Sequence, residues 1–338
     1  IRRSFYLQFR KNRRYRKETL QTKIQKKTSG EGKGVETILV KAVGFLCMIL
    51  CGFILKKIGV FAEDDANTVA KIVLKITLPM SIVHNFASLT LTTSHLIPIG
   101  LGFATSFVVI GFVLVWSRKQ EPAKRAFLLI NCAGYNLGLC VLPYLQSFFD
   151  AEAVTIICMF DVSNAIMCFG GTFAIAMAVV GGKAFMNKKE IGKILFSSVP
   201  FVTYLVMILM SALRLRFPEP VYSIAGMVGE ANPFLAMFLI GLLFEPQIQK
   251  SELRDMLEVI VIRLSTGVLF ALLIYYCLPL PLMYRQVLVL VVFGPILSIA
   301  PIYTERCGYR RSVAAVLNSF MLPFSLVVIT ILMILMGI

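Results

Sequence analysis

Ten long apolar segments, joined by short polar connections, occupy almost the whole chain after residue 35. A membrane-spanning helix needs about 20 predominantly apolar residues, because it must cross a hydrocarbon layer roughly 30 Å thick. Inside lipid a chain must satisfy its own backbone hydrogen bonds, and segments of this length do so as helices. We therefore expect an all-α integral membrane protein with ten transmembrane helices, at approximately 38–56, 66–88, 94–117, 124–147, 153–181, 190–213, 220–244, 255–279, 285–304 and 311–337.

The composition indicates that lipid is the solvent for most of the chain. Hydrophobic residues make up 58% of it and charged residues 15%, with a mean hydropathy of +0.81. Soluble domains usually contain about 25% charged residues. The net charge of +16 does not indicate nucleic-acid binding, because 12 of the 34 Lys and Arg lie in the first 34 residues. No folded region combines basic and aromatic residues into a platform for bases, so we expect no nucleic-acid partner.

Basic residues are divided unequally between the connections. The odd-numbered connections carry 15 Lys and Arg, whereas the even-numbered connections carry three, namely Arg214, Arg216 and Arg285. Short cytoplasmic loops are enriched in Lys and Arg. We therefore expect the odd connections in the cytoplasm and both termini outside, in a multi-pass protein of the plasma (inner) membrane.

Residues 1–35 form a basic tail that conflicts with this orientation, because its positive charges would lie outside. Two explanations stay open. The tail is cytoplasmic, which requires a miscounted or re-entrant first span, or it is translated upstream sequence before a true start near Val35. The second is favoured, since the run GEGKG at 30–34 needs purine-rich codons, as a bacterial ribosome-binding site does. With so little apolar surface, the tail is expected to be disordered.

A short cytoplasmic linker, residues 182–189, divides the ten spans into five and five. An odd number of spans in each half places the second half upside down relative to the first. We therefore expect two inverted five-helix repeats, residues 36–181 and 190–338. Inverted repeats are typical of secondary transporters, whose solute site lies at mid-membrane where the halves meet.

The fourth segment is rich in residues that interrupt helices. Glycine loosens a helix, and proline removes a backbone donor. An unwound turn would expose backbone polar groups, which at membrane depth must face protein or a wet cavity. The alternative is ordinary packing, because Gly, Pro and Asn also occur where membrane helices touch. The candidate solute-binding residues of this segment are Asn131, Gly134, Asn136, Gly138 and Pro143.

The ninth segment occupies the matching place in the second half and contains Gly294, Pro295, Ser298 and Pro301. Paired interruptions in corresponding segments point to the solute site of a transporter. Where two broken helices cross, helix N-termini converge, and their partial positive charge favours an anion. The alternative is a kinked helix without a ligand. Pro295 and Ser298 therefore join the candidate solute site.

Asp161 is an ionisable side chain inside the fifth segment, and Asn164 shares its helix face. Ionisable residues within a membrane are functional candidates by default. A carboxylate beside an amide can bind a proton or a sodium ion, so Asp161 and Asn164 are the candidate ion-coupling pair. The alternative is a structural pair between Asp161 and Lys75. Arg263 and Glu230 are weaker candidates.

Other chemistries are not indicated. The eight cysteines show no CxxC spacing and lie mostly in apolar runs, which favours packing over disulfides or metal binding. The histidines, His84 and His95, do not form a ligand cluster. Phosphate-loop, zinc-protease and nucleophile-elbow motifs are absent from the sequence. We expect no enzyme activity, no metal and no cofactor, with H⁺ or Na⁺ as the coupling ion.

Four short stretches follow one another along residues 36–338: LPMSIVHNF at 78–86, N-x-G-x-x-x-x-P from Asn136 to Pro143, Asn232-Pro233 followed by Gly241, and GPILSIAPIYTE at 294–305. In this order they resemble the auxin efflux carrier family, which includes the PIN carriers of plants and many bacterial permeases. The chain is most similar to the bacterial branch, because its central linker is short.

This resemblance implies two inverted five-helix repeats whose fourth and ninth spans are broken and cross at the substrate site. It implies that Asn136 contacts substrate and that Pro295 marks the second crossing. Tyr135 stands where plant carriers have proline, so auxin itself is not carried over. Bacterial relatives are associated with malate, malonate and similar carboxylates, which helix N-termini can bind. The pair Asp161 and Asn164 also resembles a feature of some bacterial members.

The expected function is that of a secondary active transporter, a permease that moves a small organic anion across the plasma membrane by alternating access. The alternative is a membrane receptor or sensor that binds a small solute without transporting it. The expected partners are the lipid bilayer and the organic anion, and homodimer formation stays open.

Overall fold

The computed structural model describes the chain in four stretches, residues 36–87, 92–181, 188–244 and 252–338. The expected tail, residues 1–35, lies outside the described residues. Most of the expected linker also lies outside them, and its last two residues, 188–189, already belong to a helix. These two expectations therefore stay predictions.

The chain divides into two compact units. The larger unit is residues 45–329, and the smaller unit is residues 1–44 together with 330–338. In the smaller unit the described residues are helical at 36–44 and 330–335, and each stretch is one end of a longer helix. All features of the site described below lie within the larger unit.

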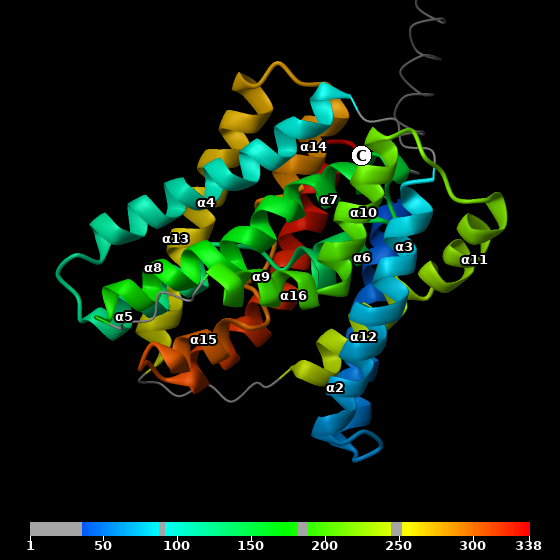
Figure 1. Ribbon diagram of the computed structural model, residues 1–338. Coiled ribbons are helices and arrows are strands. Elements are labelled where there is room, and N and C mark those ends of the chain that lie inside the picture. Colours follow the sequence, from blue (N-terminus) through cyan, green and yellow to red (C-terminus); the bar gives the residue numbers. More distant parts are fainter. Residues whose placement is uncertain (1–35, 88–91, 182–187, 245–251) are drawn as a thin grey trace, which may run out of the picture. The chain divides into compact units, whose positions relative to one another are not determined.

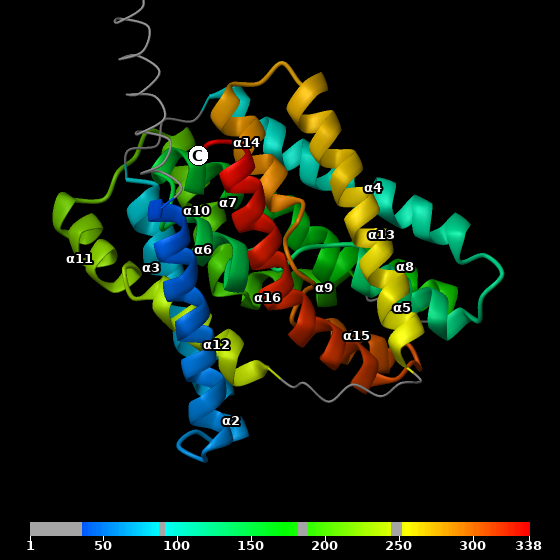
Figure 2. The ribbon, with the colours of Figure 1, turned by 180° about the vertical axis from the view of Figure 1, so that it is seen from behind.

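Every regular element among the described residues is a helix (Figures 1 and 2). In chain order they are the first helix (Glu36–Lys57), α2 (Glu63–Ile72), η1 (Val73–Thr77), α3 (Leu78–Asn85), η2 (Thr93–His95), α4 (Leu96–Trp116), α5 (Pro122–Cys132), η3 (Leu137–Val141), α6 (Leu142–Leu145), α7 (Ala151–Ile166), η4 (Met167–Gly171), α8 (Thr172–Val179), α9 (Lys188–Ser197), α10 (Val199–Ala212), α11 (Glu219–Gly229), α12 (Asn232–Leu243), α13 (Leu253–Leu272), η6 (Leu273–Cys277), α14 (Leu282–Val291), α15 (Ala300–Arg306) and α16 (Arg311–Leu335).

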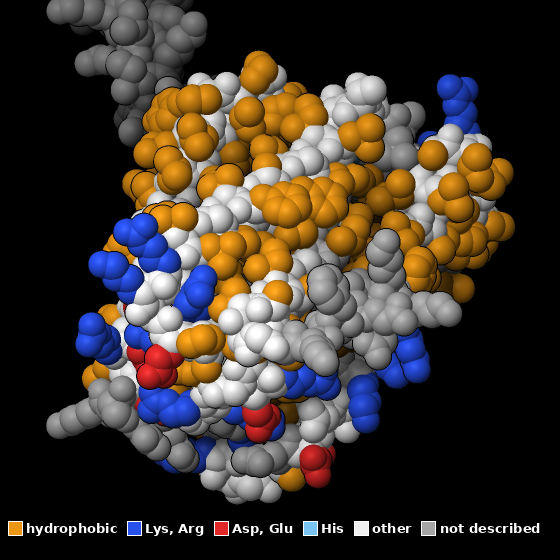
Figure 3. Space-filling view, turned by 60° about the vertical axis from the view of Figure 1, so that its left-hand side comes forward, with side chains coloured by type: hydrophobic (Ala, Val, Ile, Leu, Met, Phe, Trp, Pro, Cys, Tyr) orange, Lys and Arg blue, Asp and Glu red, His pale blue; other side chains and the backbone are white. Residues whose placement is uncertain are grey.

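Eight helical stretches of the described chain are long and apolar enough to cross a membrane. The segments expected as the sixth and ninth spans contain shorter apolar helices, Val199–Ala212 and Leu282–Val291. On the face shown in Figure 3, apolar side chains cover a broad area and most Lys and Arg gather toward one end. Over the residues that the structure describes, the chain is therefore an all-α, multi-pass membrane protein.

Both interruptions predicted from glycine and proline are present. In the fourth segment α5 ends at Cys132, and helical backbone resumes only at Leu137. In the ninth segment α14 ends at Val291, and α15 begins at Ala300. These two breaks are the structural basis of the candidate site.

Two further breaks were not predicted. The expected span 220–244 is divided between α11 and α12 by a turn at residues 230–231, and Pro233 stands in the first turn of α12. The expected span 190–213 is likewise divided at Ser198, with Pro200 in the first turn of α10. Proline is tolerated at a helix start because the N–H it lacks has no partner there, so both prolines begin a helix instead of bending one.

Four π turns, η1, η3, η4 and η6, lie within or next to longer helices. A π turn widens the helix by one residue per turn and is frequently found at functional sites. Nothing in the apolar periodicity predicted them. Three of the four, η1, η3 and η4, contribute residues to the wall of one cavity.

Glycines allow close contact between helices of the larger unit. A Cβ atom at Gly241 of α12 would collide with the backbone of Ile49, and one at Gly52 with the backbone of Phe238. A Cβ at Gly102 of α4 would collide with Ser163 of α7. Small residues at such crossings let membrane helices approach closely, which increases dispersion contacts and stabilises their packing.

Candidate functional site

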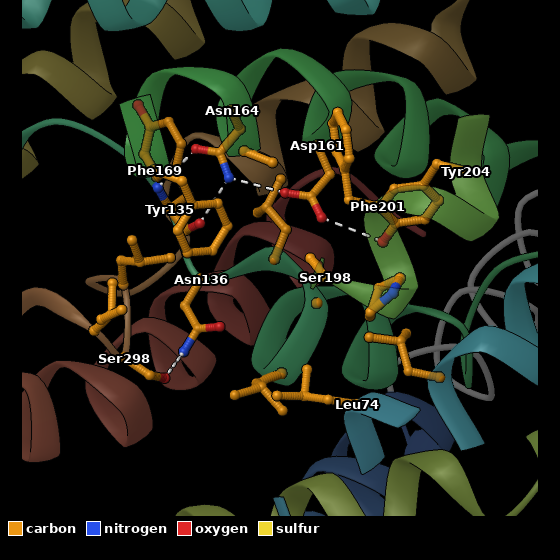
Figure 4. Close-up of a pocket in the computed structure, with 18 residues that line it drawn as sticks. Leu74, Tyr135, Asn136, Asp161, Asn164, Phe169, Ser198, Phe201, Tyr204 and Ser298 are labelled. Atoms are coloured by element: carbon orange, nitrogen blue, oxygen red, sulfur yellow. Dashed lines mark hydrogen bonds between the residues drawn. The ribbon is translucent and has the colours of Figure 1, made fainter. Parts of the chain in front are cut away.

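A cavity of about 260 Å³ lies where the two interruptions come together (Figure 4). Its wall is mainly apolar, with a few polar groups pointing inward, which is typical of sites for small molecules. The residues that line it are Leu74, Leu78, Tyr135, Asn136, Leu137, Gly138, Leu139, Asp161, Asn164, Ala165, Phe169, Ser198, Pro200, Phe201, Tyr204, Leu297, Ser298 and Ile299.

Gly134 allows the fourth segment to leave the helix. Its φ of +100° lies in the left-handed region, where a side chain is strained. A Cβ at this position would also collide with the Cys168 sulfur. The chain then runs non-helically to Asn136, and the new helical stretch starts at Leu137. Both the backbone conformation and the lack of space therefore favour glycine at position 134.

The two interruptions are hydrogen-bonded to one another. The backbone N–H of Asn136 donates to the Pro295 carbonyl at 2.9 Å. The side-chain amide of Asn136 donates to the hydroxyl of Ser298 at 2.6 Å. Asn136 thus joins the fourth segment to the ninth through both its main chain and its side chain, at the edge of the cavity (Figure 4).

Asp161 and Asn164 form a connected polar group on α7. The Asn164 amide donates to Asp161 Oδ1 at 2.9 Å, and the Tyr204 hydroxyl donates to Asp161 Oδ2 at 3.2 Å. Asp161 is only 9% exposed, whereas Lys75 is exposed to the surroundings of the larger unit. The structural pair of Asp161 with Lys75 is therefore not what the structure shows, because the carboxylate bonds to uncharged groups.

Asn164 also binds the unwound backbone. Its Oδ1 accepts from the Tyr135 N–H at 2.9 Å, and its Nδ2 donates to the Tyr135 carbonyl at 2.8 Å. One side chain therefore replaces the helical hydrogen bonds that Tyr135 lacks. Buried backbone groups need such partners, because an unpaired donor or acceptor costs about 1–3 kcal/mol.

Arg263 of α13 lies on the other side of the interruptions and makes four hydrogen bonds to carbonyl oxygens. Nη1 donates to the carbonyls of Asn131, Cys132 and Gly134 at 3.1, 3.0 and 2.9 Å. Nη2 donates to the Gly294 carbonyl at 2.6 Å. The guanidinium carbon also lies 5.2 Å from the centre of the Tyr135 ring, a cation–π distance.

The charge of Arg263 is stabilised by dipoles. The side chain is 7% exposed, and among the described residues no carboxylate lies at ion-pair distance from it. Carbonyls at the C-terminal end of a helix carry partial negative charge, and α5 ends at this point. Arg263 thus caps the C-terminal end of α5 and binds the non-helical backbone that follows α14.

Sequence reasoning did not predict the contacts of Arg263. The available signal was a lone cation within an apolar segment, which must find partners in the protein interior. That signal does not reveal which backbone carbonyls will be free to accept. Their release depends on the two interruptions meeting, which only the fold determines.

The predicted solute-binding residues separate into two groups. Asn136, Gly138 and Ser298 line the cavity, as do the predicted ion-coupling residues Asp161 and Asn164. The predicted residues that do not line it are Asn131, Gly134, Pro143 and Pro295.

Asn131 is fully buried, and its amide donates to the Phe127 carbonyl and the Thr304 hydroxyl. It therefore connects α5 to α15 behind the cavity. Glu230, a weaker candidate, is exposed at the turn between α11 and α12. The His84 ring contacts the Tyr222 carbonyl. None of these three side chains lines the cavity.

Several cavity residues were not predicted. Tyr204, Phe201 and Ser198 come from the start of α10, and Phe169 comes from a π turn. Their spacing in the sequence resembles ordinary apolar packing. Among the described residues, no group of three or more His, Cys, Asp and Glu is close enough to hold a metal ion.

The sequence of this region has known relatives. The profile of a family described as membrane transport protein matches residues 37–197, which include the first interruption and the pair Asp161 and Asn164. The match covers just under half of the chain, and residues 37–197 are similar to the membrane transport protein family. The first two of the four stretches, at 78–86 and 136–143, lie within the matched residues, which supports the family resemblance inferred from them.

One relative in the membrane transport protein family is an uncharacterized transporter from Methanothermobacter thermautotrophicus. It is 26% identical over 136 residues, which cover 39% of this chain and 44% of the relative. The chain therefore matches less than half the length of that relative. Both similarities support a membrane transporter.

Proposed function

We propose that this protein is a secondary active transporter that moves a small organic anion across the plasma membrane by alternating access. The observation that carries the proposal is the meeting of the two interrupted segments at one cavity, through Asn136, Pro295 and Ser298. Discontinuous helices beside a buried cavity are the usual form of a transporter's solute site.

An anion with an apolar body fits the chemistry of this cavity. Most of the wall is apolar, and the volume of about 260 Å³ limits the solute to a small molecule. The helical stretch that starts at Leu137 presents backbone N–H groups at its N-terminal end, whose partial charge is positive. The positive charge of Arg263 lies against the ring of Tyr135 and adds to the positive potential at this wall of the cavity.

The order of the interruptions supports inverted repeats. They fall in the fourth and the ninth apolar segments, which are equivalent positions if each half has five spans. We propose accordingly ten spans in two inverted repeats, with both termini outside. The paired breaks then form a crossing near mid-membrane, as in other carriers with inverted repeats.

Asp161 and Asn164 are proposed as the ion-coupling site. Asp161 lines the same cavity that would receive the anion, so two negative charges would repel each other there. Binding of H⁺ or Na⁺ at the carboxylate removes this repulsion. Cation and anion would then bind together, which couples their movement.

Flux into proteoliposomes tests the proposal. We expect the purified protein to carry a small carboxylate, and Asn136→Ala to reduce this flux at least tenfold, because the side-chain hydrogen bond to Ser298 of the ninth segment is lost and the amide no longer faces the cavity. Asn85→Ala is a matched control, since Asn85 bonds to Ser81 on its own helix and does not line the cavity. Unchanged flux in Asn136→Ala would remove the crossing from the site.

The receptor alternative gives a different result. A solute that stabilises the protein against heat but does not move across the vesicle membrane, with or without an ion gradient, would identify a sensor. A thermal-shift screen against mono- and dicarboxylates, amino acids and indole acids, with and without sodium, supplies the solute for both experiments.

A further inference from the structure

One peptide unit, which joins Gly134 to Tyr135, is held by side chains at both ends. Its carbonyl accepts from Arg263 Nη1 at 2.9 Å. Its N–H donates to Asn164 Oδ1 at 2.9 Å. Hydrogen bonds in series polarise one another, so Arg263 and Asn164 act on the same dipole from opposite sides.

The orientation of Asn164 depends in turn on Asp161. The Asn164 amide donates to Asp161 Oδ1 at 2.9 Å and to the Tyr135 carbonyl at 2.8 Å. A side-chain amide has two donor hydrogens, and both are used here. A cation that binds the Asp161 carboxylate must therefore disturb an amide that holds the unwound backbone.

Arg263 extends this connection to the second interruption. Its other nitrogen, Nη2, binds the Gly294 carbonyl at 2.6 Å, one residue before the proline that accepts from Asn136. The planar guanidinium presents several donors in fixed directions, whereas a lysine ammonium is a compact point charge. An arginine is therefore suited to hold both interruptions at once, and a lysine is not.

Other groups around Asp161 do not offer an equivalent connection. The ionisable side chains that face it are Tyr204 from α10 and Cys158 and Cys168 from its own segment. None of the three donates to or accepts from the backbone of the ninth segment in the hydrogen bonds of the described residues. The hydrogen-bonded connection from Asp161 to the ninth segment therefore runs through Asn164 and Arg263.

We propose that Arg263 and Asn164 are positioning residues that transmit cation binding at Asp161 to both interruptions and so set the affinity for the solute. The inference rests on the proposed transport function. It adds a defined route, Asp161 to Asn164 to the peptide 134–135 to Arg263, by which ion and solute affinities are coupled. By linkage, whatever factor the ion applies to solute affinity, the solute applies to ion affinity.

The experiment compares Arg263→Lys with Arg285→Lys in proteoliposomes. Arg285 is a matched control, because it also donates to a carbonyl, that of Tyr275, and lies 5.6 Å from the centre of a tyrosine ring, but this hydrogen bond is to neither interruption. The measured quantity is the KM for the carboxylate at several values of pH and of sodium concentration.

We expect the KM of the unmodified protein and of Arg285→Lys to depend on one of these ions. In Arg263→Lys we expect a KM raised at least tenfold that no longer changes with the ion. A loss of folding alone would lower the maximal rate without removing the ion dependence of KM. Full ion dependence in Arg263→Lys would overturn the proposal, and so would an unmodified protein whose KM responds to neither ion.

A second variant tests the other end of the route. Asn164→Ala leaves the hydrogen bonds of Arg263 in place and removes the amide that joins Asp161 to Tyr135. We expect the same ion-independent KM, and retained ion dependence would overturn the route even if Arg263→Lys failed to fold. Absence of any carboxylate flux in the unmodified protein is distinct, because it refutes the transport function and the inference with it.

Discussion

Two asparagines of the fourth segment, five residues apart, have different roles in the structure. Asn136 lines the cavity and binds Ser298, whereas Asn131 lies behind the cavity and binds Phe127 and Thr304. The sequence gives both the same weight, because the amide group is the same. The turn at Gly134 separates them, since it changes the direction of the backbone between the two residues.

Asn131→Ala is therefore expected to reduce stability and not solute recognition. The substitution removes the amide that donates to the buried Thr304 hydroxyl and joins α5 to α15. Loss of a partner for a buried polar group lowers the free energy of unfolding by about 1–3 kcal/mol. Thermal unfolding in detergent should occur at lower temperature, while the KM for the carboxylate stays within about twofold, a change worth less than ~0.5 kcal/mol. A KM raised tenfold at normal stability would place Asn131 in the site after all.

Asp161→Asn is expected to uncouple transport from the ion. Asparagine keeps the shape of the side chain and can still accept from Asn164, but it takes up no proton at neutral pH, and its uncharged oxygen binds a sodium ion more weakly than a carboxylate does. Counterflow of labelled carboxylate should continue, while accumulation driven by a proton or sodium gradient should stop.

Asp150→Asn is the control for this charge change. Asp150 caps α7 by accepting from the Ala153 N–H, and asparagine caps a helix equally well. Gradient-driven accumulation in Asp161→Asn at the rate of the control would show that the carboxylate carries no coupling ion.

At the scale of elements, the contact between the first helix and α12 depends on two glycines. Gly241→Ala is expected to destabilise this pair, because the added methyl group would overlap the backbone of Ile49. Overpacking of this kind costs about 1–3 kcal/mol. Gly111→Ala on α4 is the control, because no atom lies within 4 Å of its added Cβ. Equal melting temperatures for the two variants would contradict this close contact.

The helical elements and their interruptions were predictable, but the contacts at the interruptions were not. Clusters of Gly and Pro in the fourth and ninth segments predicted both breaks, because these residues act on the local backbone. The turn before Asn232-Pro233 was missed, since a single proline is compatible with a kinked span or a new helix start. The π turns that line the cavity left no signal, because widening a helix by one residue changes no residue type.

At the scale of the whole molecule, ion pairs join the start of α5, the start of α13 and the residue before α16 at one end of the larger unit. Lys124 at the start of α5 pairs with Asp255 and Glu258 of α13, each at 2.9 Å, and Arg310 before α16 pairs with Asp255 at 3.1 Å. Burial raises the pKa of Tyr309, and its hydrogen bond to Asp255 raises it further, so the phenol stays a donor at neutral pH. Residues 118–125, 252–254 and 306–311 were all assigned to the cytoplasm from the charge of their connections, and this assignment stays a prediction.

Labelling with a membrane-impermeant maleimide tests this assignment. In a background where the exposed Cys47, Cys51 and Cys277 are serine, Lys119→Cys should react only from the cytoplasmic side and Arg216→Cys only from the outside. Both positions are exposed, so access depends on the side of the membrane alone. Reaction of both from one side would refute the ten-span arrangement.

The crossing beside the cavity consists largely of main-chain groups, which leave the helix at Gly134 and are bound by Arg263. Most wall residues, such as Leu74, Phe169 and Phe201, contribute only apolar side chains. Single substitutions of these side chains could therefore change which solute is bound without altering the backbone of the two interruptions. Redesign toward a larger carboxylate would best begin at Phe169 and Phe201, leaving the glycine and the arginine untouched.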